Sequence, residues 1–340
     1  MITPIETAWE PELWRIELSQ ALRSANDLLS YVQLSNADFP DSSTLSAVEA
    51  DFPVLVPRSF ADRMTPGKPA DPLLRQVLAR GEESRTVDGL SLDPLNETSD
   101  AAIPAPGLIK KYHGRALLIT TSGCAVHCRY CFRRHFPYEE HRPTALAGAL
   151  DAIRQDPTLS EVILSGGDPL LLDDRRLTEL LHNLAAIPHI RRIRIHTRIP
   201  VVLPTRITSM LLQTLANSAV PIIMVIHTNH PQELDHNTAR ALRLLSRAVR
   251  FLFNQAVLLN GINDSADVQI ALCERLFDQQ VLPYYLHMPD AVVGTHHFLL
   301  EDSAASVIYA KMQAGLPGFL VPKLVREIAG EASKSTLALA

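Results

Sequence analysis

The chain has 340 residues, 46% of them hydrophobic and 20% charged, with a formal net charge of −5. These values suit one large α/β domain with a helical extension, and they give no sign of a nucleic-acid surface or a charged tail. No apolar run approaches the roughly 20 residues of a membrane span, the amino terminus lacks a secretory leader pattern, and four cysteines do not make a disulfide scaffold. We therefore expect a cytoplasmic protein that contacts neither nucleic acid nor membrane directly.

The residue pattern divides the chain into three parts. Residues 1–105 alternate helical apolar spacing with proline-rich turns and predict a helical extension. Residues 106–316 alternate short β-rich runs with amphipathic helices at a period of about 30 residues, as βα units do. Residues 317–340 form a separate carboxyl-terminal segment. The predicted strands are 116–121, 161–166, 191–197, 221–228, 250–259 and 283–288.

Six such units predict a partial, open parallel βα barrel, because each helical crossover returns the next strand beside the previous one. A doubly wound open sheet is the competing architecture, but no G-x-G-x-x-G fingerprint follows the first strand. Each predicted strand ends in a polar cluster, such as SGGDP, HTR, HTNHP or HMPD. Since the carboxyl ends of barrel strands meet at one mouth, we expect these clusters to surround one site, covered by the extension.

Three cysteines follow the first predicted strand with the spacing C-x3-C-x2-C, namely Cys124, Cys128 and Cys131. A thioredoxin-like pair would use only the last two and would leave Cys124 without a role. A structural zinc site would need a fourth ligand, and His127 and His135 are available. A third possibility is an iron–sulfur cluster held by three thiolates.

The fourth cysteine does not complete a four-thiolate cluster in any obvious way. Cys273 lies 142 residues after Cys131, on the apolar face of a predicted helix, where a small core residue is the simpler interpretation. Three thiolates on a cubane leave one iron without a protein ligand. An open coordination position allows a substrate or coenzyme to bind the metal.

This cysteine motif at the end of a barrel strand resembles the radical S-adenosylmethionine (SAM) superfamily. The resemblance implies a 4Fe–4S cluster whose open iron binds SAM. The second strand ends in Ser165, Gly166, Gly167 and Asp168, where the superfamily has a glycine-rich turn that receives the methionyl amino group. Glycines let the backbone approach a ligand closely, and the aspartate adds charge. Alone, GGDP would indicate only a turn.

Further motifs resemble the lysine 2,3-aminomutases. They include CRYCFRRHF, IRIHTRIPVVLPTRIT, NQAVLLNGIND and LPYYLHMPD, in order over about 280 residues. The likeness is closest to the shorter subgroup that makes (R)-β-lysine from L-lysine for elongation factor P, to which a lysyl-tRNA-synthetase-like ligase attaches it. One alternative is a catabolic or osmolyte-forming aminomutase that makes (S)-β-lysine. The other is an iron–sulfur or zinc protein without radical activity.

The resemblance also implies site residues and a third cofactor, pyridoxal 5′-phosphate. The cofactor lysine corresponds to Lys334, with Lys323 as the second choice. Arg133 matches an arginine that binds the substrate carboxylate, Asp290 an acid that binds the distant ammonium, and Arg115 a further arginine that contacts the cofactor. Without the resemblance, Lys334 reads as part of a solvated tail, Arg133 as a surface arginine and Asp290 as a helix cap.

The chain departs from the free-lysine aminomutases near Lys334. The glycine run before the lysine is missing, and Pro322 stands near the expected place of a second ammonium-binding acid. Glu327 or Glu331 could supply that acid. The resemblance further implies an external, flavodoxin-like electron donor and allows a homo-oligomer.

Overall fold

The computed structural model describes residues 7–39, 45–139 and 146–337, so the outer ends of the first and last predicted parts lie outside the described residues. The described helices are α1 (Leu13–Ser19), α2 (Ala25–Tyr31), α3 (Leu45–Asp51), α4 (Arg58–Ala61), α5 (Leu146–Gln155), α6 (Asp174–Ala185), α7 (Ile199–Val202), α8 (Ser209–Ala216), α9 (His236–Ala248), α10 (Ala266–Asp278) and α11 (Asp302–Gly315). None of them is long and apolar enough to cross a membrane.

The described strands form one sheet in sequence order, from β1 to β9. They are β1 (Leu108–Tyr112), β2 (Arg115–Thr121), β3 (Glu161–Gly166), β4 (Arg192–Thr197), β5 (Ile222–Ile226), β6 (Phe251–Val257), β7 (Leu282–His287), β8 (Lys323–Arg326) and β9 (Ser335–Thr336).

The sheet confirms the predicted class, a partial parallel βα barrel. Strands β2 to β8 pair in parallel, and antiparallel β1 and β9 form the two edges. The unbroken sequential order excludes a doubly wound sheet, whose strand order reverses at a switch point. The six predicted strands correspond to β2 to β7. Strands β1, β8 and β9 were missed because they are short and mixed in polarity, as in KKY and KLVR.

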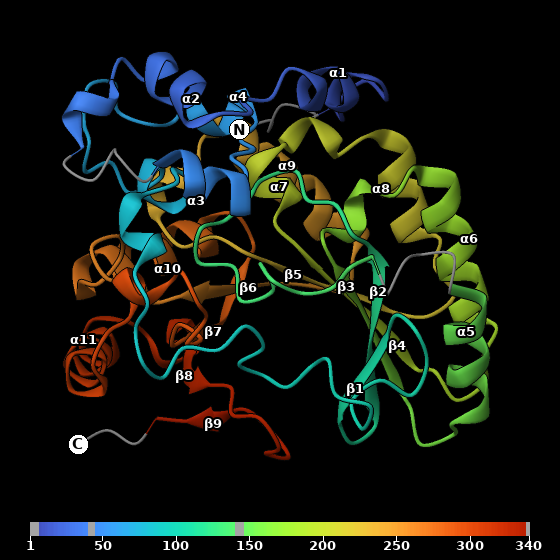
Figure 1. The fold of residues 1–340 in the computed structure, drawn as a ribbon. Coiled ribbons are helices and arrows are strands. Elements are labelled where there is room, and N and C mark those ends of the chain that lie inside the picture. The colour runs from blue at the N-terminus through green and yellow to red at the C-terminus, as the bar shows by residue number, and fades with distance from the viewer. Residues whose placement is uncertain (1–6, 40–44, 140–145, 338–340) are drawn as a thin grey trace.

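The barrel helices lie outside the sheet, where their sequence pattern places them. In α6, Leu177, Leu181 and Leu184 recur at helical spacing and are buried. Asp173 caps the amino end of the helix, because its carboxylate accepts a hydrogen bond from the Arg176 backbone N–H. Asp235 and Ser265 cap α9 and α10 in the same way. Figure 1 shows α5, α6 and α8 along one side of the barrel and α10 and α11 along the other.

The amino-terminal helices cover the end of the barrel at which the cysteine loop lies (Figure 1). The loop backbone is bonded to them, because His127 N–H donates to the Leu55 carbonyl at 2.9 Å and Arg129 N–H to the Gln76 carbonyl at 2.8 Å. From residue 85 the chain then runs past the open side of the sheet to β1 (Figure 1). On that path Ser91 bridges to Val292, beyond β7. The extension therefore both covers one end of the barrel and crosses its open side.

Candidate active site

A cavity of about 330 Å³ lies inside the barrel, at and below the carboxyl ends of the strands. The structure brings all the predicted site residues to this one cavity, although they come from β2 and β3, from the loops after β2, β3 and β7, and from the carboxyl-terminal segment. They are Arg115, Cys124, Cys128, Cys131, Arg133, Ser165, Gly166, Gly167, Asp168, Asp290 and Lys334. The predicted convergence of polar strand ends is therefore what the structure shows.

The three cysteines of the loop are free thiols, and Cys273 is buried in the hydrophobic core, as its helix face predicted. The loop is held from beneath by Arg129, whose fully buried guanidinium donates to Glu83 at 2.6 and 2.9 Å. Glu83 belongs to the extension and also pairs with Arg134 at 2.9 Å. The extension therefore positions the loop through buried, charge-assisted hydrogen bonds.

The described residues favour a cluster over a single metal ion. No three His, Cys, Asp or Glu side chains in the described ranges are placed to hold one ion. His127 Nδ1 lies 2.8 Å from the Pro53 carbonyl and His135 Nε2 3.2 Å from the Val293 carbonyl, and neither histidine joins the cysteines in a three-residue metal-binding group among the described residues. The irons of a cubane are separate, so three thiolates need not meet at one point. The donor set therefore fits a 4Fe–4S cluster with one open iron.

The turn after β3 needs both of its glycines. Gly166 has a φ of +120°, and a Cβ added to Gly167 would lie 1.9 Å from the Gly123 carbonyl oxygen. The Gly167 N–H donates to the Thr121 carbonyl at 2.7 Å, and the Asp168 N–H to the Gly123 carbonyl at 2.8 Å. The turn therefore packs directly against the start of the cysteine loop, which only glycine permits.

Asp168 lines the cavity, but its carboxylate has protein partners. It accepts hydrogen bonds from Thr197 Oγ1 at 2.7 Å and from the backbone N–H groups of Arg198 and Ile199 at 2.7 and 3.1 Å. Burial raises the pKa of Asp168 to about 6, although these hydrogen bonds oppose the shift. The side chain thus holds the segment after β4 against the turn after β3, a role that the sequence did not predict.

Arg133 is buried, and its guanidinium is hydrogen-bonded to a carboxylate of the extension. Its Nε and Nη2 donate to the two carboxylate oxygens of Glu97 at 2.6 and 3.0 Å, and its Nη1 donates to Ser165 Oγ at 3.0 Å. Burial opposes the charged form of Arg133, but Glu97 raises its pKa above the ordinary value. The resemblance implied that this guanidinium binds the substrate carboxylate, but in the structure the carboxylate of Glu97 takes that position.

Lys334 lies at the other end of the cavity, beside Glu327. Its Nζ forms an ion pair with the Glu327 carboxylate and lies 5.7 Å from the centre of the Tyr285 ring. Lys111 of β1 also forms an ion pair with Glu327. The same lysine pairs with Glu97 at 3.2 Å. Burial would raise the pKa of Glu327, but the two lysines lower it below its ordinary value. Glu327 is thus an ionised acid between two cations.

The sequence left two alternatives, Glu327 or Glu331 as the second acid and Lys334 or Lys323 as the cofactor lysine, and the structure places these residues differently. Glu327 lines the cavity, whereas Glu331 is exposed and accepts a hydrogen bond from Ser335. Lys323 is exposed on β8, away from the cavity. Burial and the charge of Glu327 raise the pKa of Asp290 to about 7. Two carboxylates of different acidity therefore lie near Lys334.

Three histidines in the cavity wall were not singled out as site residues. His196, His227 and His287 come from β4, the end of β5 and β7, and Nε2 of His196 and of His287 has no hydrogen-bond partner in the described structure. Burial lowers the pKa of His227 to about 3 and those of the other two well below the ordinary value, so all three are neutral at pH 7. The polar strand ends HTR, HTNHP and HMPD contain these histidines and could have indicated them from the sequence. No motif signalled Glu97.

The fold and the three-thiol loop define the class of protein, a radical SAM enzyme. The family model of the Radical SAM superfamily matches residues 118–270, from within β2 into α10. A solved radical SAM methyltransferase from Sphaerobacter thermophilus aligns with a TM-score of 0.44 at 17% identity, covering 64% of this chain and 68% of that one.

Curated relatives narrow the class to a family. L-lysine 2,3-aminomutase of Escherichia coli (strain K12) is 45% identical over 332 residues, covering 96% of this chain and 95% of the relative. L-lysine 2,3-aminomutase of Clostridium subterminale is 32% identical, covering 95% of this chain and 77% of the relative. The chain therefore belongs to the lysine 2,3-aminomutase family of radical SAM enzymes and is an isomerase.

Proposed function

We propose that this enzyme converts L-lysine to (R)-β-lysine by moving the amino group from C2 to C3. One observation carries the proposal: a single cavity joins the three free cysteines to Lys334. Cys124, Cys128 and Cys131 would hold a 4Fe–4S cluster, which with SAM supplies a radical that removes hydrogen from the substrate. Lys334 would hold pyridoxal 5′-phosphate, whose ring delocalises the unpaired electron. The names of the relatives support lysine as the substrate.

The charged groups of the cavity would orient lysine between the two cofactors. Asp290 and Glu327 lie at the Lys334 end and offer carboxylates to the distant ammonium group. Arg133 lies in the same loop as the cysteines and offers a guanidinium to the substrate carboxylate, which must then compete with Glu97. Arg115 lies 4.7 Å over the Tyr112 ring, and its Nε has no partner among the described residues, so it is free to contact the cofactor. The amino-terminal extension, which covers one end of the barrel, would help to exclude water from a reactive radical.

The physiological setting is part of the proposal. The chain is 45% identical to the Escherichia coli relative but only 32% identical to the Clostridium one, which supports the subgroup of the former. In that subgroup a lysyl-tRNA-synthetase-like ligase attaches (R)-β-lysine to elongation factor P. The proposed setting is the cytoplasm, with an external flavodoxin-like reductant as the electron donor, and it allows a homo-oligomer. The alternative is an aminomutase that releases (S)-β-lysine.

The test is anaerobic reconstitution with iron, sulfide and pyridoxal phosphate, followed by incubation with SAM, L-lysine and dithionite. We expect β-lysine, and chiral chromatography should show the R form. An intact cluster without β-lysine would contradict the aminomutase activity, whereas (S)-β-lysine would contradict only the subgroup.

The cofactor lysine is tested separately by chemical trapping. Borohydride should attach pyridoxal phosphate covalently to Lys334, as peptide mapping by mass spectrometry would reveal. Lys334→Ala should lose both the label and the activity, and Lys323→Ala, on the exposed face of β8, is the matched control that should keep both. A label on another lysine would overturn the assignment.

A further inference from the structure

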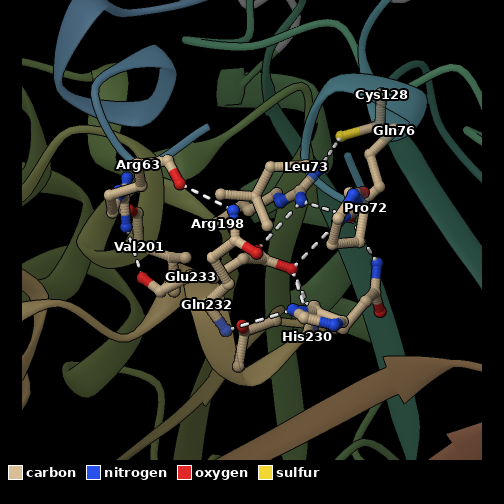
Figure 2. Close-up of polar contacts among 12 residues, drawn as sticks. Arg63, Pro72, Leu73, Gln76, Cys128, Arg198, Val201, His230, Gln232 and Glu233 are labelled. Carbon is tan, nitrogen blue, oxygen red and sulfur yellow. Dashed lines mark hydrogen bonds and ion pairs between the residues drawn. The ribbon is translucent and has the colours of Figure 1, made fainter. Parts of the chain in front are cut away.

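Arg198, directly after β4, reaches the sulfur of a predicted cluster ligand (Figure 2). Its Nη1 donates to Cys128 Sγ at 2.7 Å, and its Nη2 donates to Gln76 Oε1 at 2.7 Å and to Glu233 Oε2 at 3.1 Å. The side chain is 5% exposed. One guanidinium therefore joins the extension, the loop after β5 and the cysteine loop.

Both ends of Arg198 are fixed by buried groups. Its backbone N–H donates to Asp168. Glu233, which holds the guanidinium, is fully buried and also accepts from Gln76 Nε2 at 3.1 Å and from the backbone N–H groups of Asn229 and His230 at 2.9 and 3.0 Å. Figure 2 shows these side chains converging on the guanidinium. Because Glu233 and Gln76 are themselves held by hydrogen bonds, the fold fixes the guanidinium of Arg198 beside the sulfur.

The arginines of the cysteine loop itself have different partners from Arg198. Arg129 and Arg134 share the carboxylate of Glu83, and Arg133 pairs with Glu97. Arg198 also has an acid partner, but its second nitrogen lies on the sulfur rather than on an oxygen. A buried ion pair with Glu233 alone would not require that second contact. The sulfur contact therefore points to a role toward the metal centre.

A charged donor on a ligating sulfur has a defined physical effect. When a cluster accepts one electron, its net charge becomes more negative and the sulfurs become better acceptors, so a guanidinium hydrogen bond stabilises the reduced form more than the oxidised form. The geometry points to Arg198 as a positioning residue that holds Cys128 and raises the reduction potential of the cluster, which eases the entry of one electron from an external reductant. This inference rests on the proposed cluster at the three cysteines.

The test measures the potential of the reconstituted cluster by a dithionite titration followed by electron paramagnetic resonance, with iron and sulfide analysis of each sample. In Arg198→Gln we expect the ratio of reduced to oxidised cluster at a fixed solution potential to fall about tenfold, which is about 59 mV for a one-electron couple. Arg192→Gln, at the exposed first position of β4, is the matched control and should leave the potential unchanged.

A second variant keeps the test decisive if Arg198→Gln leaves Glu233 unpaired and fails to fold. Arg198→Gln combined with Glu233→Gln removes both charges and should lower the potential by a smaller amount in the same direction. An unchanged potential with a complete cluster in either variant would overturn the inference and leave the proposed function intact. A wild-type protein that assembles no reducible cluster would overturn both.

Discussion

The two ends of the cavity are built in contrasting ways. At the cysteine end the charged side chains have protein partners in buried, specific pairs, as in Arg129 with Glu83 and Arg198 with Glu233. At the Lys334 end, one acid lies between two lysines, a second has a pKa near neutrality, and two histidine nitrogens have no partner in the described structure. The difference indicates that the fold organises the charged pairs of the cysteine end in advance, whereas the proposed cofactor and substrate would change the charge balance of the Lys334 end.

The largest expected effect comes from replacing a cysteine of the candidate site, compared with the same replacement of a cysteine in the hydrophobic core. Cys128→Ser should lose iron and all β-lysine formation, because a serine oxygen is a poor ligand for cluster iron. In Cys273→Ser the cluster should persist, but the free energy of unfolding should fall by about 1–3 kcal/mol, because a hydroxyl enters the hydrophobic core. Iron analysis and urea unfolding measure the two effects. Full iron content in Cys128→Ser would remove it from the ligand set.

A second experiment probes the acids of the Lys334 end. Asp290→Asn removes a carboxylate that we propose binds the substrate ammonium, and kcat/KM for lysine should then fall about 10- to 100-fold, as is usual for a lost hydrogen bond to a charged group. Steady-state kinetics with the cluster fully loaded measure it. The contrast between the two ends also requires that the cluster spectrum stay unchanged in this variant. An altered spectrum would show that the ends are not independent.

The pKa of Asp290 predicts a pH dependence confined to the same end. Its carboxyl faces Glu327 and Glu97, which raise its pKa, and Lys334 and Lys111, which lower it, while burial raises it most, to about 7. The neutral acid cannot pair with an ammonium, so kcat/KM for lysine should fall about tenfold per pH unit below 7 and level off above it. Asp290→Asn should abolish this step. A step that persists in the variant belongs to another group.

The smallest expected effect concerns Glu97, which pairs with Arg133. If this acid competes with the substrate carboxylate, Glu97→Gln should lower KM for lysine about three- to tenfold, although it leaves the buried Arg133 unpaired and lowers the free energy of unfolding by about 3 kcal/mol. Glu83→Gln, at the cysteine end, should lower stability and cluster content but leave KM for lysine unchanged in the molecules that hold a full cluster. A higher KM in Glu97→Gln would mean that Glu97 positions Arg133 for the substrate.

Much of the fold was predictable because the signals are local. The alternation of β-rich runs with amphipathic helices predicted β2 to β7 and their parallel order. Strands β1, β8 and β9 escaped prediction because edge strands of mixed polarity form only against a neighbour already in place. The cysteine motif and the glycine turn were also readable, since their spacing within one loop determines what they can hold.

The sequence by itself determined the partial barrel and the three-thiol loop, because periodicity and local spacing act over a few residues. Only the tertiary structure decided that Glu97 of an irregular segment holds Arg133, that Glu327 rather than Glu331 joins Lys334, and that Arg198 reaches Cys128 across 70 positions. Such contacts have no period in the sequence. Their electrostatic consequences depend on distance and burial, which arise only when the strands bring distant segments into one cavity.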